Sequence, residues 1–186
     1  NAGVQEGQAT TTGYMLFKRF NRSISKTSPG VASQNRPSII FRLADFYLIY
    51  AEVANEVNPS DSRVLTYLNL VRERAGLPKV EILNPGIVGN KELQRAAIQR
   101  ERQIELATEG QRYFDVRRWM IADKDGEGRQ NGYAHGMNVR GTINDTEEFN
   151  RVVETEKIVF NRKMYLQPIP DHEMRKTQNL VQNPGW

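Results

Sequence analysis

Apolar residues recur at intervals of three and four from Ile39 onward, and this spacing constrains the fold more than any other feature of the sequence. Such a period places the residues on one side of an α-helix, so the segment is expected to form an amphipathic helix. Asn58-Pro59 ends it, because proline lacks an amide hydrogen and disfavours helix in the residue before it. The predicted apolar stripe consists of Leu43, Phe46, Tyr47, Tyr50, Ala51, Ala54 and Val57.

A second helix is expected a few residues later, capped by Ser60 or Asp61. Gly76 followed by Pro78 ends it in the usual order. Two helices joined by so short a link should pack antiparallel, because neither can bury its stripe alone. The predicted stripe of the second helix consists of Val64, Leu68, Val71 and Ala75.

Two more helices are expected beyond a connector over residues 77–90. Asn90 caps one that runs from Lys91 to Glu109, and the other runs from Gln111 to Ala122 after Gly110. The apolar stripe predicted for the first of these two consists of Leu93, Ala97, Ile104 and Ala107, and Trp119 in the second is expected in the core.

The remaining chain is expected to be poor in regular structure. Residues 1–38 read as an irregular or extended segment, and residues 123–150 as a long loop with several glycines. Two short segments, 154–160 and 164–169, are predicted to pair as strands. The expected fold is therefore mostly α, with antiparallel helix pairs that resemble tetratricopeptide units of about 34 residues, a loop-rich face and a few short strands. Residues 39–186 are expected to form a single helical domain.

Composition excludes several classes of protein. The chain has no cysteine, so disulfides, thiolate metal sites and cysteine nucleophiles are excluded. It has only two histidines, so a histidine-rich catalytic metal site is not expected. A Gly-x-Ser-x-Gly hydrolase motif is absent from the sequence, and so is any apolar run of about 18 residues that could span a membrane. The net charge of +4 is concentrated in the first 38 residues, a pattern unlike the basic helix face of a typical nucleic-acid binder.

Glu101 and Glu105 on the third helix allow two interpretations. They could act as a catalytic carboxylate pair, as in a glycosidase. Alternatively, they belong to a buried network with arginines from the neighbouring helices. Carboxylates four residues apart lie on one wall of a helix instead of flanking a substrate, and nearby arginines lower a carboxyl pKa, so we favour the network. Its candidate arginines are Arg72, Arg74, Arg112, Arg117 and Arg118.

The glycine-rich loop offers two further candidate sites. Asp123, Asp125 and Glu127 follow the spacing that opens a calcium loop, but Ala134 stands where the bidentate carboxylate should be. We therefore expect no cofactor, with calcium at these three residues left open. Sugars are bound by aromatic faces beside polar groups, and loops are the place where aromatics remain available. The predicted ligand-binding residues are Asn131, Tyr133 and His135 in this loop, together with Tyr14 in the segment 1–38.

Five motifs follow one another along the chain. They begin at Arg42, Arg72, Glu101, Leu166 and Gln182, and read RLADFYLIYAE, RERAGL, ERQIELATEGQRYFDVRRW, LQPIP and QNPGW. In this order they resemble the motifs of the SusD/RagB family. The resemblance is strong from Arg42 to Trp186 and weak over residues 13–18.

The resemblance implies a cell-surface lipoprotein of the outer membrane that binds glycans or other nutrients. Such proteins pass oligosaccharides to a SusC-like TonB-dependent transporter, and they are not enzymes. The chain looks like the carboxyl-terminal part of such a protein, whose membrane attachment would depend on an amino-terminal lipid outside this sequence. The alternative is a helical interaction scaffold that docks the transporter without a ligand site of its own.

Overall fold

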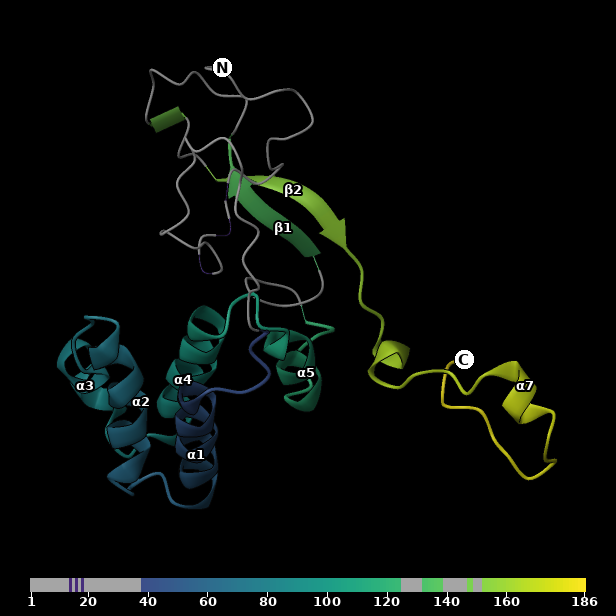
Figure 1. Cartoon of the computed structure of the whole chain (residues 1–186), viewed down its shortest axis with the longest axis horizontal. Helices are drawn as coiled ribbons and strands as arrows, with labels where there is room; N and C mark the ends of the chain where they lie inside the picture. The colour runs from purple at the N-terminus through teal and green to yellow at the C-terminus, as the bar shows by residue number, and fades with distance from the viewer. Residues whose placement is uncertain are drawn as a thin grey trace, which may run out of the picture. The chain divides into compact units, whose positions relative to one another are not determined.

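The computed structural model describes residues 38–124, 132–138, 147–148 and 152–186, together with Tyr14, Leu16 and Lys18 (Figure 1). The chain forms two compact units, and the boundary between them follows Arg118. One contains residues Arg36–Arg118, and the other includes the described residues of Trp119–Trp186. The single-domain boundary at residue 39 stays a prediction.

The first two helices confirm the sequence prediction. Helix α1 spans Leu43–Val57 and α2 spans Arg63–Arg74. The N-cap residue is Ser62 instead of the predicted Ser60 or Asp61, and it makes no side-chain cap bond; the amide of Arg63 donates instead to the Asp61 carboxylate at 2.9 Å. Gly76 ends the helix with a φ of +76°, a conformation that glycine adopts without steric cost.

A small apolar core joins α1 to α2 and α4, the helix at Lys91–Glu105. These three helices lie side by side in Figure 1. The side chain of Ile98 on α4 is fully buried and belongs to the same apolar cluster as residues of α1 and α2. The other members of the cluster are Ala44, Leu48, Ala51, Val64, Leu68 and Val71.

The stripe predicted for α1 is wrong for four of its seven members. Leu43, Phe46, Tyr50 and Val57 are all exposed, whereas Leu48 is fully buried. Helix α1 carries apolar side chains on two sides, and the neighbouring helices cover only one of them. Periodicity alone cannot decide between two apolar faces of one helix. On α2, the predicted Ala75 lies at the exposed end, while the other three residues are buried as expected.

Two short elements occupy the predicted connector. Helix α3 spans Val80–Leu83, and the 3₁₀ helix η1 spans Pro85–Ile87. The buried side chain of Asn69 fixes α3, since it accepts a hydrogen bond from the Val80 amide at 3.0 Å.

Helix α4 begins as predicted and ends early. Asn90 caps it by accepting from the Leu93 amide at 3.1 Å, but the helix stops at Glu105 instead of Glu109. Thr108 and Gly110 both have positive φ values, so the backbone turns before Gly110.

The apolar stripe predicted for α4 is wrong for three of its four members, and only Ala97 packs against the core. Leu93, Ile104 and Ala107 are exposed, while the buried face consists of Gln94, Ile98, Glu101 and Arg102. Polar side chains can occupy a buried face when they find hydrogen-bond partners there. Gln94 does so, because its amide donates to the Asn55 side chain at 3.0 Å and to the Pro59 carbonyl at 2.8 Å.

Helix α5 spans Gln111–Arg118, four residues shorter than expected. Asp115 and Val116 are its buried residues. Trp119 is half-buried and therefore not the core residue that the sequence suggested.

The predicted strand pairing is wrong. Strand β1, Gly132–Met137, lies within the stretch expected to be a loop, and it pairs antiparallel with β2, Val152–Ile158. The segment expected to be the second strand instead begins with the 3₁₀ helix η2, Arg162–Tyr165, where the Met164 amide donates to the Asn161 carbonyl at 2.8 Å.

The carboxyl end is held by side chains bonded to backbone groups. Helix α7 spans Asp171–Met174. The Gln182 side chain exchanges two hydrogen bonds with the backbone of Ile169, at 2.8 and 2.9 Å. The Trp186 indole donates to the carbonyls of Lys163 and Leu166, both at 3.0 Å.

Candidate functional site

Only some of the four predicted ligand-binding residues lie among those that the structure describes. Tyr14 is exposed, and Asn131 lies outside the described residues. Tyr133 and His135 both lie on β1, where His135 is exposed, and the side chain of Tyr133 is not among those described. The site assignment stays a prediction.

Asp123, the first residue of the possible calcium loop, is bonded to Tyr165. The Tyr165 hydroxyl donates to the Asp123 carboxylate at 2.5 Å, and the Asp123 amide donates back to that hydroxyl at 3.1 Å. Burial, together with the hydrogen bond to Asp123, raises the pKa of Tyr165. Asp125 and Glu127 lie outside the described residues, and the described part of the chain contains no group of three metal-ligating side chains. Calcium binding stays a prediction.

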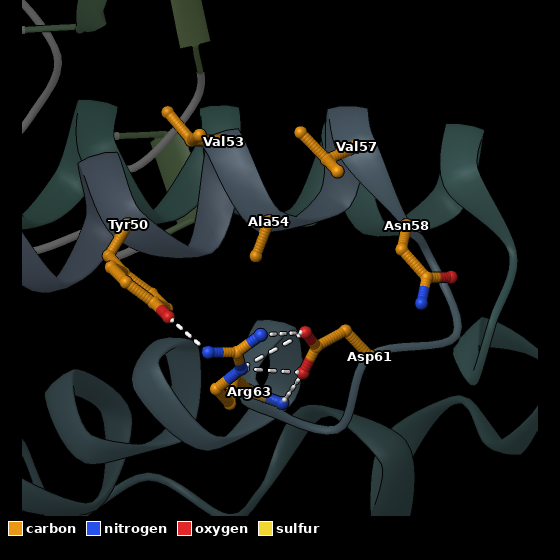
Figure 2. Close-up of a pocket in the computed structure, with 7 residues that line it drawn as sticks. All are labelled: Tyr50, Val53, Ala54, Val57, Asn58, Asp61 and Arg63. Atoms are coloured by element: carbon orange, nitrogen blue, oxygen red, sulfur yellow. Dashed lines mark hydrogen bonds and ion pairs between the residues drawn. The ribbon is translucent and has the colours of Figure 1, made fainter.

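A cavity of about 200 Å³ lies between α1 and the start of α2 (Figure 2). Its apolar lining comes from Val53, Ala54 and Val57 of α1, and Figure 2 shows Ala54 pointing toward Arg63. The remaining lining residues that matter here are Tyr50, Asn58, Asp61 and Arg63.

The charges in this cavity are already paired. The Arg63 guanidinium binds both Asp61 oxygens and donates to the Tyr50 hydroxyl at 2.8 Å. Hydrogen bonds from Arg63 lower the pKa of Asp61 to about 2. The cavity is therefore electrically neutral around Arg63 and offers a ligand no unpaired charge there.

A larger cavity of about 540 Å³ lies within the unit Trp119–Trp186. Its size falls in the range of small-molecule sites, which is roughly 300–1,000 Å³. Apolar and aromatic side chains and two cations line it, namely Met120, Tyr165, Leu166, Pro184, Arg162 and Lys163.

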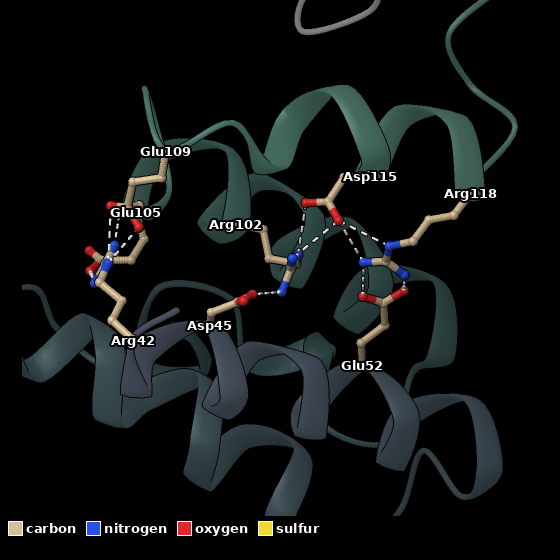
Figure 3. A network of polar contacts seen from close by, with 8 residues as sticks. All are labelled: Arg42, Asp45, Glu52, Arg102, Glu105, Glu109, Asp115 and Arg118. Carbon is tan, nitrogen blue, oxygen red and sulfur yellow. Dashed lines mark hydrogen bonds and ion pairs between the residues drawn. The ribbon is translucent and has the colours of Figure 1, made fainter. Parts of the chain in front are cut away.

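The helical unit is joined by a buried network of ion pairs (Figure 3). The Arg102 guanidinium binds Asp115 through two hydrogen bonds and Asp45 through a third, at 2.9 Å. All three side chains are at most 4% exposed. Arg118 extends the network, since it binds Asp115 and also both oxygens of Glu52.

Glu101 and Glu105 are bound by arginines, as we predicted. Arg72 donates to the buried Glu101 at 2.8 Å, and Arg74 donates to Glu105 at 2.5 Å. Arg42 binds Glu105 as well, and it also binds Glu109. Both carboxylates are paired with arginines and lie on one helix, so the geometry supports a role in helix packing.

Sequence reasoning missed Asp45 and Asp115 as the partners of Arg102. A signal was present, because Asp45 stands between Ala44 and Phe46 within an otherwise apolar run. A charged residue within an apolar stretch of a helix is informative, since its burial requires a partner.

A family model describes nearly the whole chain. The model of the SusD family matches residues 2–186. The chain belongs to the SusD family. The family resemblance inferred from the five motifs is thereby confirmed, as is the mostly helical fold class.

Known relatives agree with this assignment. SusD-like protein P25 of Formosa agariphila is 44% identical over 106 residues, which are 57% of this chain and 19% of that protein. SusD-like protein P2 of the same organism is 31% identical over 153 residues, which are 80% of this chain and 26% of that protein. This chain thus spans about a quarter or less of the relatives' length.

Solved structures show the same fold. A SusD-like protein from Bacteroides fragilis superposes with a TM-score of 0.64 at 30% identity, over 80% of this chain and 26% of that one. The structure of BT4246 gives a TM-score of 0.65 at 34% identity, over 82% of this chain and 24% of its own. Among the described residues, none of the helices has the length and apolar character needed to cross a membrane.

Proposed function

We propose that this SusD family member binds glycans at the cell surface and delivers oligosaccharides to a SusC-like TonB-dependent transporter. The family match over residues 2–186 carries the proposal. The ordered motifs and the superposition on SusD-like structures support it. Attachment to the outer membrane through an amino-terminal lipid is part of the same proposal.

The proposed role is binding without catalysis. Two-carboxylate hydrolysis of glycosides needs an acid and a second carboxylate on opposite sides of a substrate. In the described helices Glu101 and Glu105 are instead bound by Arg72 and Arg74. We expect that incubation with oligosaccharides releases no reducing ends. Release in proportion to the amount of purified protein would contradict this expectation.

A glycan array probed with the purified protein tests the proposal. We expect binding to a chemically related subset of glycans, and confirmation of each hit by isothermal titration. Delivery is tested by co-purification with the transporter from outer membranes, before and after addition of the bound glycan. Absence of binding to every glycan on the array would reject the glycan-binding role.

A second candidate function is a scaffold that docks the transporter without its own ligand site. The uncovered apolar side of α1 favours it, since Phe46, Val53 and Val57 are all more than half exposed. Exposed apolar surface of this kind often marks an interaction site. Two results together would favour the scaffold over the glycan-binding role. The unmodified protein would bind no glycan, and Val53→Glu would no longer co-purify with the transporter.

A further inference from the structure

We infer that the cavity near the carboxyl end binds an anionic sugar unit, one that carries a carboxylate or a sulfate group. The inference rests on the proposed glycan-binding function and names the ligand class for one site. The larger cavity and the cavity beside Arg63 differ in how their charged side chains are paired, and the inference starts from this difference.

Arg162 and Lys163 bring two positive charges to the larger cavity. Among the residues that the structure describes, neither has a carboxylate partner; the Lys163 ammonium lies instead over the Trp186 ring, 4.3 Å from its centre. In the smaller cavity, by contrast, Arg63 is bound to Asp61. An anionic group entering the larger cavity therefore displaces no internal ion pair, and it gains charge-assisted hydrogen bonds.

The position of Lys163 is fixed by the chain around it. Its carbonyl accepts the indole hydrogen of Trp186. A Cβ at Gly185 would lie only 3.0 Å from the Lys163 Cβ, and Gly185 has a φ of +88°, so glycine allows the carboxyl end to pack closely there. A side chain that projects from a fixed backbone has less freedom to lose when the ligand binds.

The remaining walls suit the apolar face of a sugar ring. Met120 and Leu166 are each about half exposed and line the cavity beside Tyr165. The hydroxyl of Tyr165 is bonded to Asp123, which fixes the aromatic ring. A sugar unit with its carbon face on these side chains and its anionic group toward Arg162 would use both kinds of surface.

Isothermal titration with matched probes tests the inference. One pair is trigalacturonate and its methyl ester, which differ in charge but not in sugar sequence. The other is a sulfated trisaccharide and its unsulfated parent, which separates sulfate from carboxylate recognition. We expect at least one anionic probe to bind about tenfold more tightly than its neutral partner, and this preference should shrink as salt is added.

Variants locate the binding. Arg162→Gln should weaken the anionic probe about tenfold and leave the neutral partner unchanged, and Arg162→Lys should restore part of the affinity. Lys163→Gln should act in the same direction. Arg175→Gln is the matched control, because Arg175 is exposed and pairs with Asp171 on α7 outside the cavity lining.

Equal affinity for both members of each pair would overturn the inference, and so would unchanged binding by a folded Arg162→Gln protein. Failure of all four probes to bind would also overturn it. These failures are separable from failure of the proposed function. A protein that binds neutral glycans on the array, with no anionic preference, keeps the glycan-binding role and loses this site.

Discussion

The guanidinium of Arg102 on α4 binds the carboxylate of Asp115 on α5 at two points, with distances of 2.9 and 3.1 Å. Its third hydrogen bond reaches Asp45 on α1. One side chain therefore connects three helices whose contacting residues lie up to 57 positions apart. Removing one member of a buried ion network lowers the unfolding free energy by more than the network contributes to it, because the remaining charges are left buried and unpaired.

Arg102→Met should destabilise the helical unit by about 3–5 kcal/mol, because Asp45 and Asp115 would be left buried without their cation. Urea unfolding followed by circular dichroism measures the loss. Arg95→Met is the control on the same helix, since Arg95 forms exposed ion pairs with Glu56 and Glu92 and should cost about 1 kcal/mol or less. Equal losses in the two variants would contradict the special role of Arg102.

Glu101→Ala should cost about 3–5 kcal/mol, because it leaves the largely buried guanidinium of Arg72 without its carboxylate. The double variant with Arg72→Ala completes a mutant cycle and isolates the pair. Thermal unfolding provides the measurement. A melting temperature that stays unchanged in Glu101→Ala, together with altered turnover of a glycan, would revive the catalytic interpretation.

Asn90→Ala should destabilise α4 by about 1 kcal/mol, because the Leu93 amide loses its acceptor. Asn90→Asp keeps an acceptor and should retain most of the stability. Chemical unfolding of the two variants side by side checks the prediction, which fails if the aspartate variant is as unstable as the alanine one.

Glu56 should make stability dependent on acid. Its hydrogen bond with Arg95 lowers the pKa from 4.5 to about 2. A carboxyl whose pKa is depressed by folding stabilises the protein above its unfolded pKa, and this contribution is lost as the pH falls through its folded pKa. The difference in unfolding free energy between the unmodified protein and Glu56→Gln should therefore shrink between about pH 4.5 and about pH 2.

The control for this pH series is Glu73→Gln, because Glu73 is about half exposed and its ion pair with Lys79 is 3.7 Å long. Its effect should change little over the same interval. A constant difference for Glu56→Gln throughout the acid range would contradict the prediction.

Replacing Tyr14 and Tyr133 together with Ala should weaken glycan binding about tenfold or more without unfolding the protein, if these rings hold a sugar. Isothermal titration with a glycan identified on the array measures the effect. Tyr113→Ala is a suitable comparison, because Tyr113 lies on α5 and packs against Phe114 and Arg117. Unchanged affinity in the folded double variant would show that the two rings are not part of the binding site.

Local signals predicted the helices that carry them. The end of α1 followed from Pro59, and the start of α4 from Asn90, because each acts on its own neighbours in the chain. The buried face of α4 could not be predicted in this way. Gln94 and Arg102 are buried because Asn55 and Asp45 meet them there, and those partners come from a distant part of the sequence. Strand β1 was missed for the same reason, since its pairing partner is β2.

The candidate site shows a similar division. The arginine network around Glu101 was predictable in kind, since a charge on the inner face of a helix needs a partner. The cavity beside Arg162 was not, because it forms where Met120 and the carboxyl end meet η2. The spacing of residues along the sequence does not predict which distant segments come together in this way.

The placement of the two tryptophans allows intrinsic fluorescence to follow one unit of the chain. Both tryptophans, Trp119 and Trp186, belong to the unit Trp119–Trp186, and the helical unit contains none. Tryptophan fluorescence therefore follows one unit, whereas far-ultraviolet dichroism is dominated by the helices of the other, and coincident transitions would mean that the two unfold together. Because the ammonium of Lys163 lies over the indole ring of Trp186, a ligand that draws the lysine away changes the emission without any added label.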